Sequence, residues 1–363
     1  MNPEFWHGKR VLVTGHTGFK GSWLSLWLQS LQAQAIGYSL PPPTEPSLFV
    51  SAGVAKGMES IEGSVLDVKH LRRVVREHEP EIMIHMAAQS LVRRSYTDPS
   101  GTYATNVMGT VNVLEVLRDV PALRSVVVVT TDKCYENRGE VKAHREDDSL
   151  SGDDPYSSSK AAAELVAAAY RRSFFAANGQ DVRTGIATAR AGNVIGGGDW
   201  AEDRIIPDVM RAVDGKRELL VRNPDAVRPW QHVLDPLCGY LMLAEKLWKD
   251  PVRFGGAWNF GPDERETWAV GDVLRLLQEL WGNEFTWRVD KSSQPHESRY
   301  LKLDSTKART LLGWHPKWDL RSALAATVNW FKAYQRREDL RRITLEQMQS
   351  YQRALRVPEA AQI

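Results

Sequence analysis

The chain has 363 residues, which is long enough for about two domains or for one large domain with a smaller annex. Lysine and arginine together number 47 and aspartate and glutamate 45, and this near balance gives no support for a general nucleic-acid-binding protein. The 42% apolar and 25% charged residues are typical of a folded protein and argue against disorder over most of the chain.

Neither a membrane span nor a metal site is expected. No stretch of about 18 uncharged apolar residues predicts a membrane-spanning helix, and the first ten residues contain no apolar segment of signal-peptide length. We therefore expect a cytoplasmic protein. The two cysteines, Cys134 and Cys238, form no CxxC pair, which argues against a disulfide scaffold or a cysteine-rich zinc site, and we expect no bound metal.

Up to about residue 190, short apolar runs alternate with segments of helical periodicity. The runs are continuously apolar, as is typical of strands buried on both faces, and this favours a parallel sheet with helices on both sides. The expected strands are 10–14, 35–38, 81–87, 125–130 and 184–189. The expected helices are 19–31, 68–77, 101–118 and 155–176. The predicted fold class is α/β, with a Rossmann-type doubly wound parallel sheet.

The pattern changes after residue 190, where a triple glycine and many proline-flanked loops follow. Further helices are expected near 207–214, 234–249 and 268–281. We place one domain at residues 1–190 with returns to the sheet near 230–260, and a smaller α/β domain at 191–229 and 261–335. Residues 336–363 form a polar helical tail, for which a solvated helix is the preferred interpretation.

A glycine-rich loop joins the first expected strand to the first expected helix. Gly15 can take the tight turn, Gly18 lets the backbone approach a pyrophosphate, and Gly21 lets the helix pack closely on the sheet. Free N–H groups at the helix N-terminus favour an anion there. The motif predicts a dinucleotide site, which we assign to Gly15, His16, Thr17, Gly18, Phe19, Lys20 and Gly21. Lys20 either compensates charge at the phosphates or is solvated.

Residues 37–40, near the end of the second expected strand, include no acidic side chain for a ribose hydroxyl and no arginine for a 2′-phosphate. The usual marker of cofactor choice is therefore missing from this sequence.

Two further motifs carry chemistry. Tyr156 and Lys160 lie four residues apart, on one face of a helix that begins with Asp154-Pro155. A nearby ammonium lowers a tyrosine pKa, so Tyr156 is a candidate acid–base group. The other motif is Thr131-Asp132-Lys133, directly after a strand, where ligands bind in open parallel sheets. Taken alone, Thr131 and Asp132 are better explained by a turn or a helix N-cap.

Together these motifs resemble the extended short-chain dehydrogenase/reductase superfamily over roughly residues 8–330. The resemblance includes residues 85–89, Asn106 and residues 228–233. It implies a nicotinamide dinucleotide in the N-terminal domain and a nucleotide sugar in the smaller C-terminal domain. It adds Asp67, Ala87, Ala88, Gln89 and Asn106 to the cofactor contacts, together with Tyr156 and Lys160.

Within that superfamily, residues 131–135 resemble the 4,6-dehydratases. Segments 14–24, 131–137, 192–200 and 295–304 resemble the family that acts on CDP-glucose. That resemblance implies the conversion of CDP-D-glucose to CDP-4-dehydro-6-deoxy-D-glucose and water, in deoxysugar synthesis for lipopolysaccharide O-antigen. The reaction is redox-neutral overall, which favours NAD as the cofactor.

The resemblance also implies roles for individual residues. Tyr156 takes the proton of the C4 hydroxyl, Lys160 keeps it ionisable and Thr131 orients the oxygen. Asp132, with a raised pKa, is the acid of the elimination and Lys133 its base. The substrate contacts are Asn193, Arg204, Arg228, Arg299 and Tyr300. A surface ion pair is the alternative for each arginine.

We expect a homodimer or homotetramer. The helices at 101–118 and 155–176 resemble those that pair between subunits in the superfamily, although their alanines could equally pack on their own sheet. Three other functions stay open: a nucleotide-sugar 4-epimerase, a 4,6-dehydratase for another nucleotide sugar, and a dinucleotide sensor without catalysis.

Overall fold

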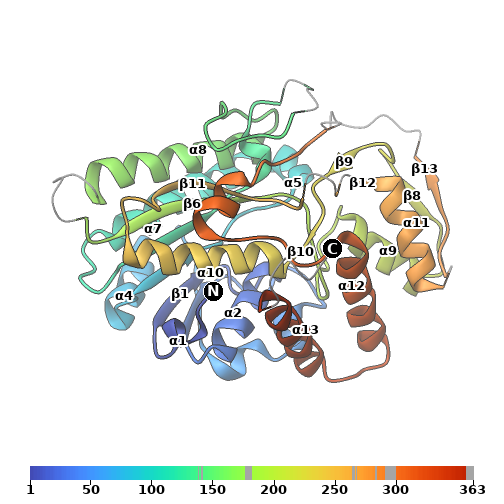
Figure 1. The fold of residues 1–363 in the computed structure, drawn as a ribbon, viewed down its shortest axis with the longest axis horizontal. Coiled ribbons are helices and arrows are strands. Elements are labelled where there is room, and N and C mark those ends of the chain that lie inside the picture. Colours follow the sequence, from blue (N-terminus) through green and yellow to red (C-terminus); the bar gives the residue numbers. More distant parts are fainter. Residues whose placement is uncertain are drawn as a thin grey trace.

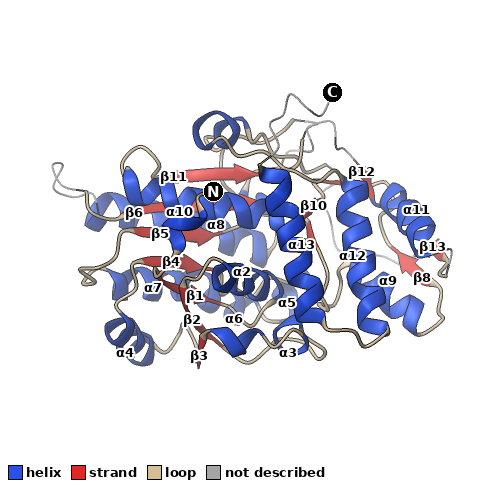
Figure 2. Ribbon diagram, turned by 60° about the horizontal axis from the view of Figure 1, so that its bottom comes forward, coloured by secondary structure: helices blue, strands red, loops and turns tan. Residues whose placement is uncertain are grey.

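The computed structural model describes residues 1–137, 139, 142–175, 182–263, 266, 268–282, 284–290 and 300–356. Its centre is a seven-stranded sheet in the order β11-β6-β5-β4-β1-β2-β3 (Figures 1 and 2). The strands are β1 (Arg10–Thr14), β2 (Gln34–Ser39), β3 (Glu59–Glu62), β4 (Ile82–His85), β5 (Ser125–Val129), β6 (Gly185–Ala191) and β11 (Gly256–Phe260). Every neighbouring pair is parallel, which confirms the predicted fold class.

The five predicted strands are present, with ends that differ by a few residues. β3 was not predicted, because it is an edge strand whose four side chains are exposed or only partly buried. The chain order along the sheet reverses between β1 and β4, and such a reversal opens a ligand crevice beyond the carboxyl ends of the strands.

Helices cover both faces of the sheet. Along β1, Val11 and Val13 belong to one hydrophobic core, while Leu12 belongs to the other. The first core holds α2 (Phe19–Ser30) and α10 (Leu234–Lys249). The second core holds α4 (Val68–His78), α7 (Gly109–Leu117) and α8 (Pro155–Tyr170). Short elements complete this half: α1 (Pro3–Trp6), α3 (Leu48–Ser51), η1 (Val54–Gly57), α5 (Val92–Thr97), α6 (Pro99–Tyr103) and η3 (Asp132–Cys134).

Two of the predicted helices contain π-helical turns. The helix expected at 101–118 is α6, followed by the π turn η2 (Ala104–Met108) and then α7. The helix expected at 155–176 is α8, followed by the π turn η4 (Arg171–Phe175). The start of α8 is as predicted: the Asp154 carboxylate accepts from the Ser157 N–H in a capping box, and Pro155 is the first helical residue.

Three of the remaining helices lie together at the other end of the molecule (Figures 1 and 2): α9 (Ile205–Asp214), α11 (Val270–Trp281) and α12 (Leu320–Gln335). The other two reach the sheet half: η5 (Ala308–Leu312) contacts α10 and β11, and α13 (Leu340–Leu355) contacts α2 and α12. The short strands are β7 (Val194–Ile195), β8 (Leu219–Val221), β9 (Val227–Arg228), β10 (Gln231–His232), β12 (Trp268–Ala269) and β13 (Trp287–Val289). No described helix is long and apolar enough to cross a membrane.

The C-terminal tail corrects an expectation. A helix is present as α13, but it is not simply solvated, because Leu340, Met348 and Tyr351 are buried against the body of the protein. The Tyr351 hydroxyl donates to the Asp235 carboxylate at 2.7 Å, and its ring contacts Trp27 of α2 edge-on. Polar and charged residues make up most of this helix and conceal its apolar stripe in the sequence.

Candidate active site

The glycine loop between β1 and α2 turns tightly. Gly15 has φ +75°, and a Cβ there would lie 2.8 Å from the Ala87 backbone nitrogen. A Cβ on Gly21 would lie 2.1 Å from the Gly15 carbonyl oxygen, so only glycine lets α2 approach the loop this closely. Gly18 is the N-cap of α2 and has no side-chain cap, which leaves the helix N-terminus available to an anion.

Two side chains of the loop are held by the neighbouring strands. His16 Nε2 lies 2.8 Å from Ser60 Oγ, and burial lowers the pKa of His16 to about 4. Thr17 Oγ1 lies 2.9 Å from Ser39 Oγ and donates to the Leu40 carbonyl. These contacts fix the shape of the loop. Phe19 is partly buried and packs on the core.

The loop after β4 is bound to the helix that carries Tyr156. The Gln89 N–H donates to Asn106 Oδ1 at 2.8 Å. Asn106 Nδ2 donates in turn to the Gln89 carbonyl at 3.0 Å and to Ser159 Oγ at 2.8 Å. Because Asn106 lies on the π turn η2 and Ser159 on α8, these bonds join three elements at the edge of the crevice. Ala87 and Ala88 lie in the same loop.

Asp67 has a visible structural role. Its carboxylate accepts from the His70 N–H at 3.0 Å and caps α4. The side chain is exposed, and its assignment to the cofactor stays a prediction.

Thr131, Asp132 and Tyr156 come together at the carboxyl end of β5. Thr131 Oγ1 donates to Asp132 Oδ1 at 3.0 Å and accepts from the Lys133 N–H as the N-cap of η3. The N-cap turn that the sequence offered as an alternative is therefore present, and the catalytic role of these side chains stays a prediction. Asp132 is 2% exposed, and its Oδ2 has no hydrogen-bond partner among the described residues.

The environment of Asp132 favours its protonated form. Burial raises the pKa of Asp132 to about 6, although Lys133, the Thr131 hydroxyl and then Arg228 oppose that shift. A carboxyl with such a pKa can donate a proton near neutral pH. The predicted direction of this shift is confirmed.

The expected effect of Lys160 on Tyr156 is not what the structure shows. Burial raises the pKa of Tyr156 to about 12, and the largest opposing effect is a hydrogen bond with Thr131. The Lys160 ammonium donates instead to the Val129 carbonyl at 2.8 Å. Burial lowers the pKa of Lys160 to about 8, against the attraction of Glu164. Desolvation is the largest effect on the Tyr156 pKa and the opposing groups are Thr131 and Arg204, which corrects the prediction of a tyrosine pKa lowered by Lys160.

The sequence analysis missed two groups at this site, Tyr240 and Glu164, and it left Lys20 either solvated or at the phosphates; the second alternative stays a prediction. Lys20 does not extend into solvent: its ammonium donates to the Tyr240 hydroxyl of α10 at 2.8 Å. Tyr240 is fully buried, and no sequence signal marks it, because it lies 220 residues from Lys20. Glu164 is the other missed group. Arg190 donates to it at 2.9 Å from two nitrogens, and the pair anchors α8 against β6.

The arginines expected at the substrate differ in their burial and in their partners. Arg228 lies on β9, is 4% exposed and influences the Asp132 carboxyl electrostatically. Arg204 precedes α9 and pairs with Asp199 at 2.9 Å, so the ion-pair alternative is present for this residue. It also donates to Ser90 Oγ at 3.3 Å. Arg299 lies outside the described residues.

Asn193 and Tyr300, the other two expected substrate residues, each accept a hydrogen bond through the backbone carbonyl. The Asn193 carbonyl accepts from the Gln231 N–H at 3.1 Å. The Tyr300 carbonyl accepts from Asn137 Nδ2 at 2.9 Å. A small hollow near Arg228 is lined by Val227, Arg228, Pro229, Pro262, Asp263, Glu266, Lys302 and Leu303.

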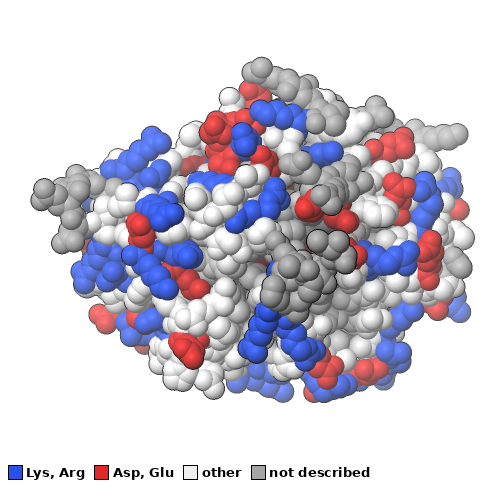
Figure 3. All heavy atoms as spheres, viewed as in Figure 1, with Lys and Arg blue, Asp and Glu red and all other residues white. Residues whose placement is uncertain are grey.

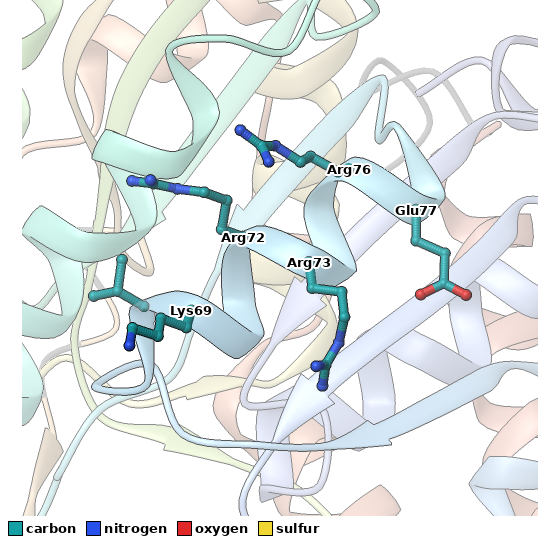
Figure 4. Close-up of a pocket in the computed structure, with 6 residues that line it drawn as sticks. Lys69, Arg72, Arg73, Arg76 and Glu77 are labelled. Atoms are coloured by element: carbon teal, nitrogen blue, oxygen red, sulfur yellow. The ribbon is translucent and has the colours of Figure 1, made fainter.

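A larger hollow lies away from these groups, along α4. It is lined by Val68, Lys69, Arg72, Arg73, Arg76 and Glu77. Figure 4 shows Arg72 and Arg76 pointing to the same side of the helix. Over the face drawn in Figure 3, basic and acidic side chains are interspersed. The part of the chain that the structure describes contains no cluster of His, Cys, Asp and Glu that could hold a metal ion.

The parallel sheet order, the glycine loop before α2 and the motifs of Thr131 and of Tyr156 with Lys160 are those of the extended short-chain dehydrogenase/reductase class. A family model described as GDP-mannose 4,6 dehydratase matches residues 12–327. The chain therefore belongs to this dehydratase family.

Several curated proteins are similar over nearly the whole chain. CDP-glucose 4,6-dehydratase of Salmonella typhimurium is 50% identical over 94% of this chain and 95% of its own length. dTDP-glucose 4,6-dehydratase of Streptomyces griseus is 30% identical over 88% and 93%.

Solved structures share the fold. A dTDP-glucose 4,6-dehydratase from Bacillus anthracis in complex with NAD has a TM-score of 0.74 and 23% identity, over 91% of this chain and 98% of its own. A UDP-glucose 4-epimerase from Thermotoga maritima with UDP-glucose has a TM-score of 0.77 and 22% identity, over 90% and 99%.

Proposed function

We propose that this protein is an NAD-dependent 4,6-dehydratase that converts CDP-D-glucose to CDP-4-dehydro-6-deoxy-D-glucose and water. The reaction class is supported by one observation above all: Asp132 is buried and protonatable, its carboxylate accepts from the Thr131 hydroxyl, and both residues affect the pKa of the neighbouring Tyr156. The choice of CDP-glucose is supported by the 50% identical relative that carries this activity in its name.

The residues present fit a dinucleotide. A Cβ at Gly15 or Gly21 would fill the space under the loop, and the N-terminus of α2 suits a pyrophosphate. We assign the loop from Gly15 to Gly21, the segment from Ala87 to Gln89 and Asn106 to its binding. When bound, NAD would supply a hydride acceptor at C4 of the sugar and return the same hydride to C6.

In the oxidation, Tyr156 takes the proton of the C4 hydroxyl and Thr131 orients that oxygen. Lys160 contributes an ammonium whose pKa of about 8 lets it exchange protons near neutral pH. With the Tyr156 pKa at about 12, the phenol is mostly protonated at neutral pH, so it releases its own proton to solvent before it takes the proton of the C4 hydroxyl.

In the elimination, the 4-ketone makes the C5 proton acidic. Asp132 donates its proton to the departing C6 hydroxyl, which leaves as water, and Lys133 removes the C5 proton. Burial supports the role of Asp132 because it keeps the carboxyl protonated to higher pH than usual. Lys133 is supported by its place next to Asp132 on η3. In the final step a proton returns to C5.

We assign substrate binding to the smaller region formed by residues 191–229 and 261–335. Arg204 and Arg228 suit a diphosphate because a guanidinium can bind it bidentately, and Arg299, Tyr300 and Asn193 complete the expected set. Arg228 is supported by its burial beside the small hollow and by its electrostatic link to Asp132.

We further propose a cytoplasmic homodimer or homotetramer that serves deoxysugar synthesis for lipopolysaccharide O-antigen. The assembly is supported by apolar side chains exposed on neighbouring helices of the Tyr156 side. These are Tyr103 of α6, Met108 of η2 and Leu165 of α8.

Product mass tests the function directly. We expect the protein to release one water from CDP-glucose, and to act far less on UDP-glucose, dTDP-glucose and GDP-mannose, as measured by mass spectrometry. Deuterium placed at C4 should reappear at C6. A product of unchanged mass would indicate an epimerase, and NAD binding without any turnover would indicate a sensor; either result contradicts the proposal.

Tyr156→Phe provides the matched variant for this assay. We expect it to lose turnover by about a hundredfold or more, which is the range of general acid–base catalysis. Tyr170→Phe is the control, because Tyr170 lies at the end of the same helix and its hydroxyl bonds only the surface residue Glu115. Near-normal turnover of Tyr156→Phe would remove this residue from its role.

A further inference from the structure

One buried arginine bonds both segments that carry the reactive side chains. Arg190 lies on β6, and its guanidinium donates from Nε and Nη2 to the Glu164 carboxylate of α8, at 2.9 Å each. From Nη1 it donates to the Tyr135 hydroxyl at 2.7 Å. The same side chain is therefore bonded to α8, which carries the groups assigned to the oxidation, and to the end of η3, which carries those assigned to the elimination.

Tyr135 is the residue that ends η3, and its side chain is buried. Its hydroxyl donates to Asn259 Oδ1 at 2.7 Å while it accepts from Arg190. Arg190 and Asn259 face each other in the parallel register of β6 and β11, so the two partners of the hydroxyl form one cross-strand pair of the central sheet. The ring of Tyr135 stacks on His144 with 4.7 Å between the ring centres. Through this hydroxyl, the end of η3 is fixed to two strands of the sheet.

Glu164 fixes α8 to the sheet in a similar way. Besides the arginine, its carboxylate accepts from Thr130 Oγ1 at the end of β5 and from Thr188 Oγ1 of β6, the latter at 2.6 Å. Glu164 follows Lys160 by four residues and Tyr156 by eight, so the three side chains lie along one face of α8. Glu164 therefore holds the face of α8 that carries Tyr156 and Lys160 against the ends of the strands.

The side chains of η3 lie between two points of attachment. Before η3, the Thr130 N–H still donates to a carbonyl of β6 at 2.9 Å, so the chain belongs to the sheet up to that residue. After η3, the chain is held by the Tyr135 hydroxyl and by backbone hydrogen bonds to residues 149–151. Asp132 and Lys133 lie in the turn between these points, so their placement depends on the second attachment as well as on the strand.

We propose that Tyr135 is a positioning residue for the elimination: its hydroxyl holds η3, and with it Asp132 and Lys133, against the sheet. Glu164, on the other side of Arg190, is the corresponding positioning residue for the oxidation, because it holds α8. Both residues act through the groups that they hold, not by contact with the substrate. This inference rests on the proposed dehydratase function.

Tyr135→Phe tests the proposal, because it removes one oxygen atom and keeps the ring that stacks on His144. A single turnover of CDP-glucose, followed by the absorbance of the reduced cofactor, separates the oxidation from the later steps. The signal should appear at the wild-type rate and decay about tenfold or more slowly, because a misplaced acid and base slow the elimination alone. The KM for CDP-glucose should keep its wild-type value.

Glu164→Gln should give the opposite pattern. It removes the charge that Arg190 binds on α8, so the signal should appear about tenfold or more slowly and should not accumulate. Tyr351→Phe is the matched control, because it also loses a buried, hydrogen-bonded hydroxyl, but on α13 and from Asp235. The control should show wild-type rates for both phases.

Binding of NAD⁺, measured by calorimetry, provides a readout without turnover. Tyr135→Phe and Tyr351→Phe should both bind NAD⁺ with the wild-type dissociation constant. A wild-type decay in Tyr135→Phe, an equal loss in both phases, or the same slow decay in Tyr351→Phe would overturn the proposal.

Glu164→Gln keeps the proposal testable if Tyr135→Phe does not fold. A slow decay or a wild-type rate of appearance in Glu164→Gln would refute the assignment of the two positioning residues. A wild-type protein that binds NAD⁺ but forms neither reduced cofactor nor product from CDP-glucose would instead contradict the proposed function.

Discussion

Burial acts on three ionisable side chains of the site in the direction that removes their charge. It raises the pKa values of Asp132 and Tyr156 and lowers the pKa of Lys160. For Asp132 this outcome serves the chemistry, because a neutral carboxyl can donate a proton to a leaving hydroxyl. For Tyr156 burial opposes ionisation, and the hydrogen bond with Thr131 offsets only part of that cost.

Replacing Asp132 with asparagine removes the proton donor but keeps the size and the acceptor for Thr131. We expect Asp132→Asn to oxidise the substrate and then stall at elimination, so that reduced cofactor accumulates, with turnover lower by about a hundredfold or more. Absorbance of the reduced cofactor in a single-turnover experiment measures this directly.

Asp153→Asn is the control for that experiment, because Asp153 is an exposed carboxylate just before α8. Unchanged turnover of Asp132→Asn, or loss of activity without reduced cofactor, would contradict the assignment of Asp132 as the acid.

At the scale of elements, one buried carboxylate ties the C-terminal helix to the sheet-covering helix α10. Asp235 Oδ1 accepts from the Tyr351 hydroxyl at 2.7 Å and from the Lys317 N–H at 2.8 Å. Its Oδ2 has no hydrogen-bond partner among the described residues. Burial raises the pKa of Asp235 to about 7, so folding favours its protonated form.

This arrangement makes stability depend on pH. The folded-state pKa lies above the unfolded value of 3.8, so the native state binds more protons and wild-type stability should fall as pH rises from about 4 to 7. The side chain of Asp235→Asn cannot ionise. The free energy of unfolding of this variant, relative to wild type, should therefore be about 2 to 4 kcal/mol higher at pH 8 than at pH 4. Urea unfolding at both pH values measures the difference.

Asp319→Asn is the control for that measurement, because Asp319 is an exposed helix cap. A difference between Asp235→Asn and wild type that stays the same at both pH values would show that Asp235 keeps its charge on folding.

At the scale of the whole molecule, large apolar side chains are exposed on the surface formed by α6, η2 and α8. Met108 is 51% exposed and Leu165 62% exposed, on elements that pack together. Leaving such a surface in water is unfavourable, and a second copy of the chain can cover it.

Leu165→Glu would place a charge in that interface. We expect the dimer to dissociate at concentrations at least about tenfold higher than for the wild type, because each subunit loses a buried leucine and buries a carboxylate instead. Analytical ultracentrifugation measures the shift. Leu220→Glu on β8, which is 50% exposed at the other end of the molecule, is the control. A monomeric wild type, or equal effects of the two variants, would contradict the proposed interface.

The sequence by itself determined the features that depend on short spacing. The glycine loop lies between an apolar run and a periodic helix, Tyr156 and Lys160 share one turn, and Asp154 caps their helix. Each follows from the bonds and sterics of a few consecutive residues, so the pattern predicts the local structure. The parallel sheet followed from the continuously apolar strands for the same reason.

Only the tertiary structure decided which distant groups meet and how burial changes them. Lys20 meets Tyr240 across 220 residues, and Arg228 reaches Asp132 from another part of the chain. The pKa of Tyr156 rises because folding removes water from its hydroxyl. The apolar side of α13 is buried because it packs against α2. These outcomes depend on solvent exclusion and long-range packing, which no local pattern of residues contains.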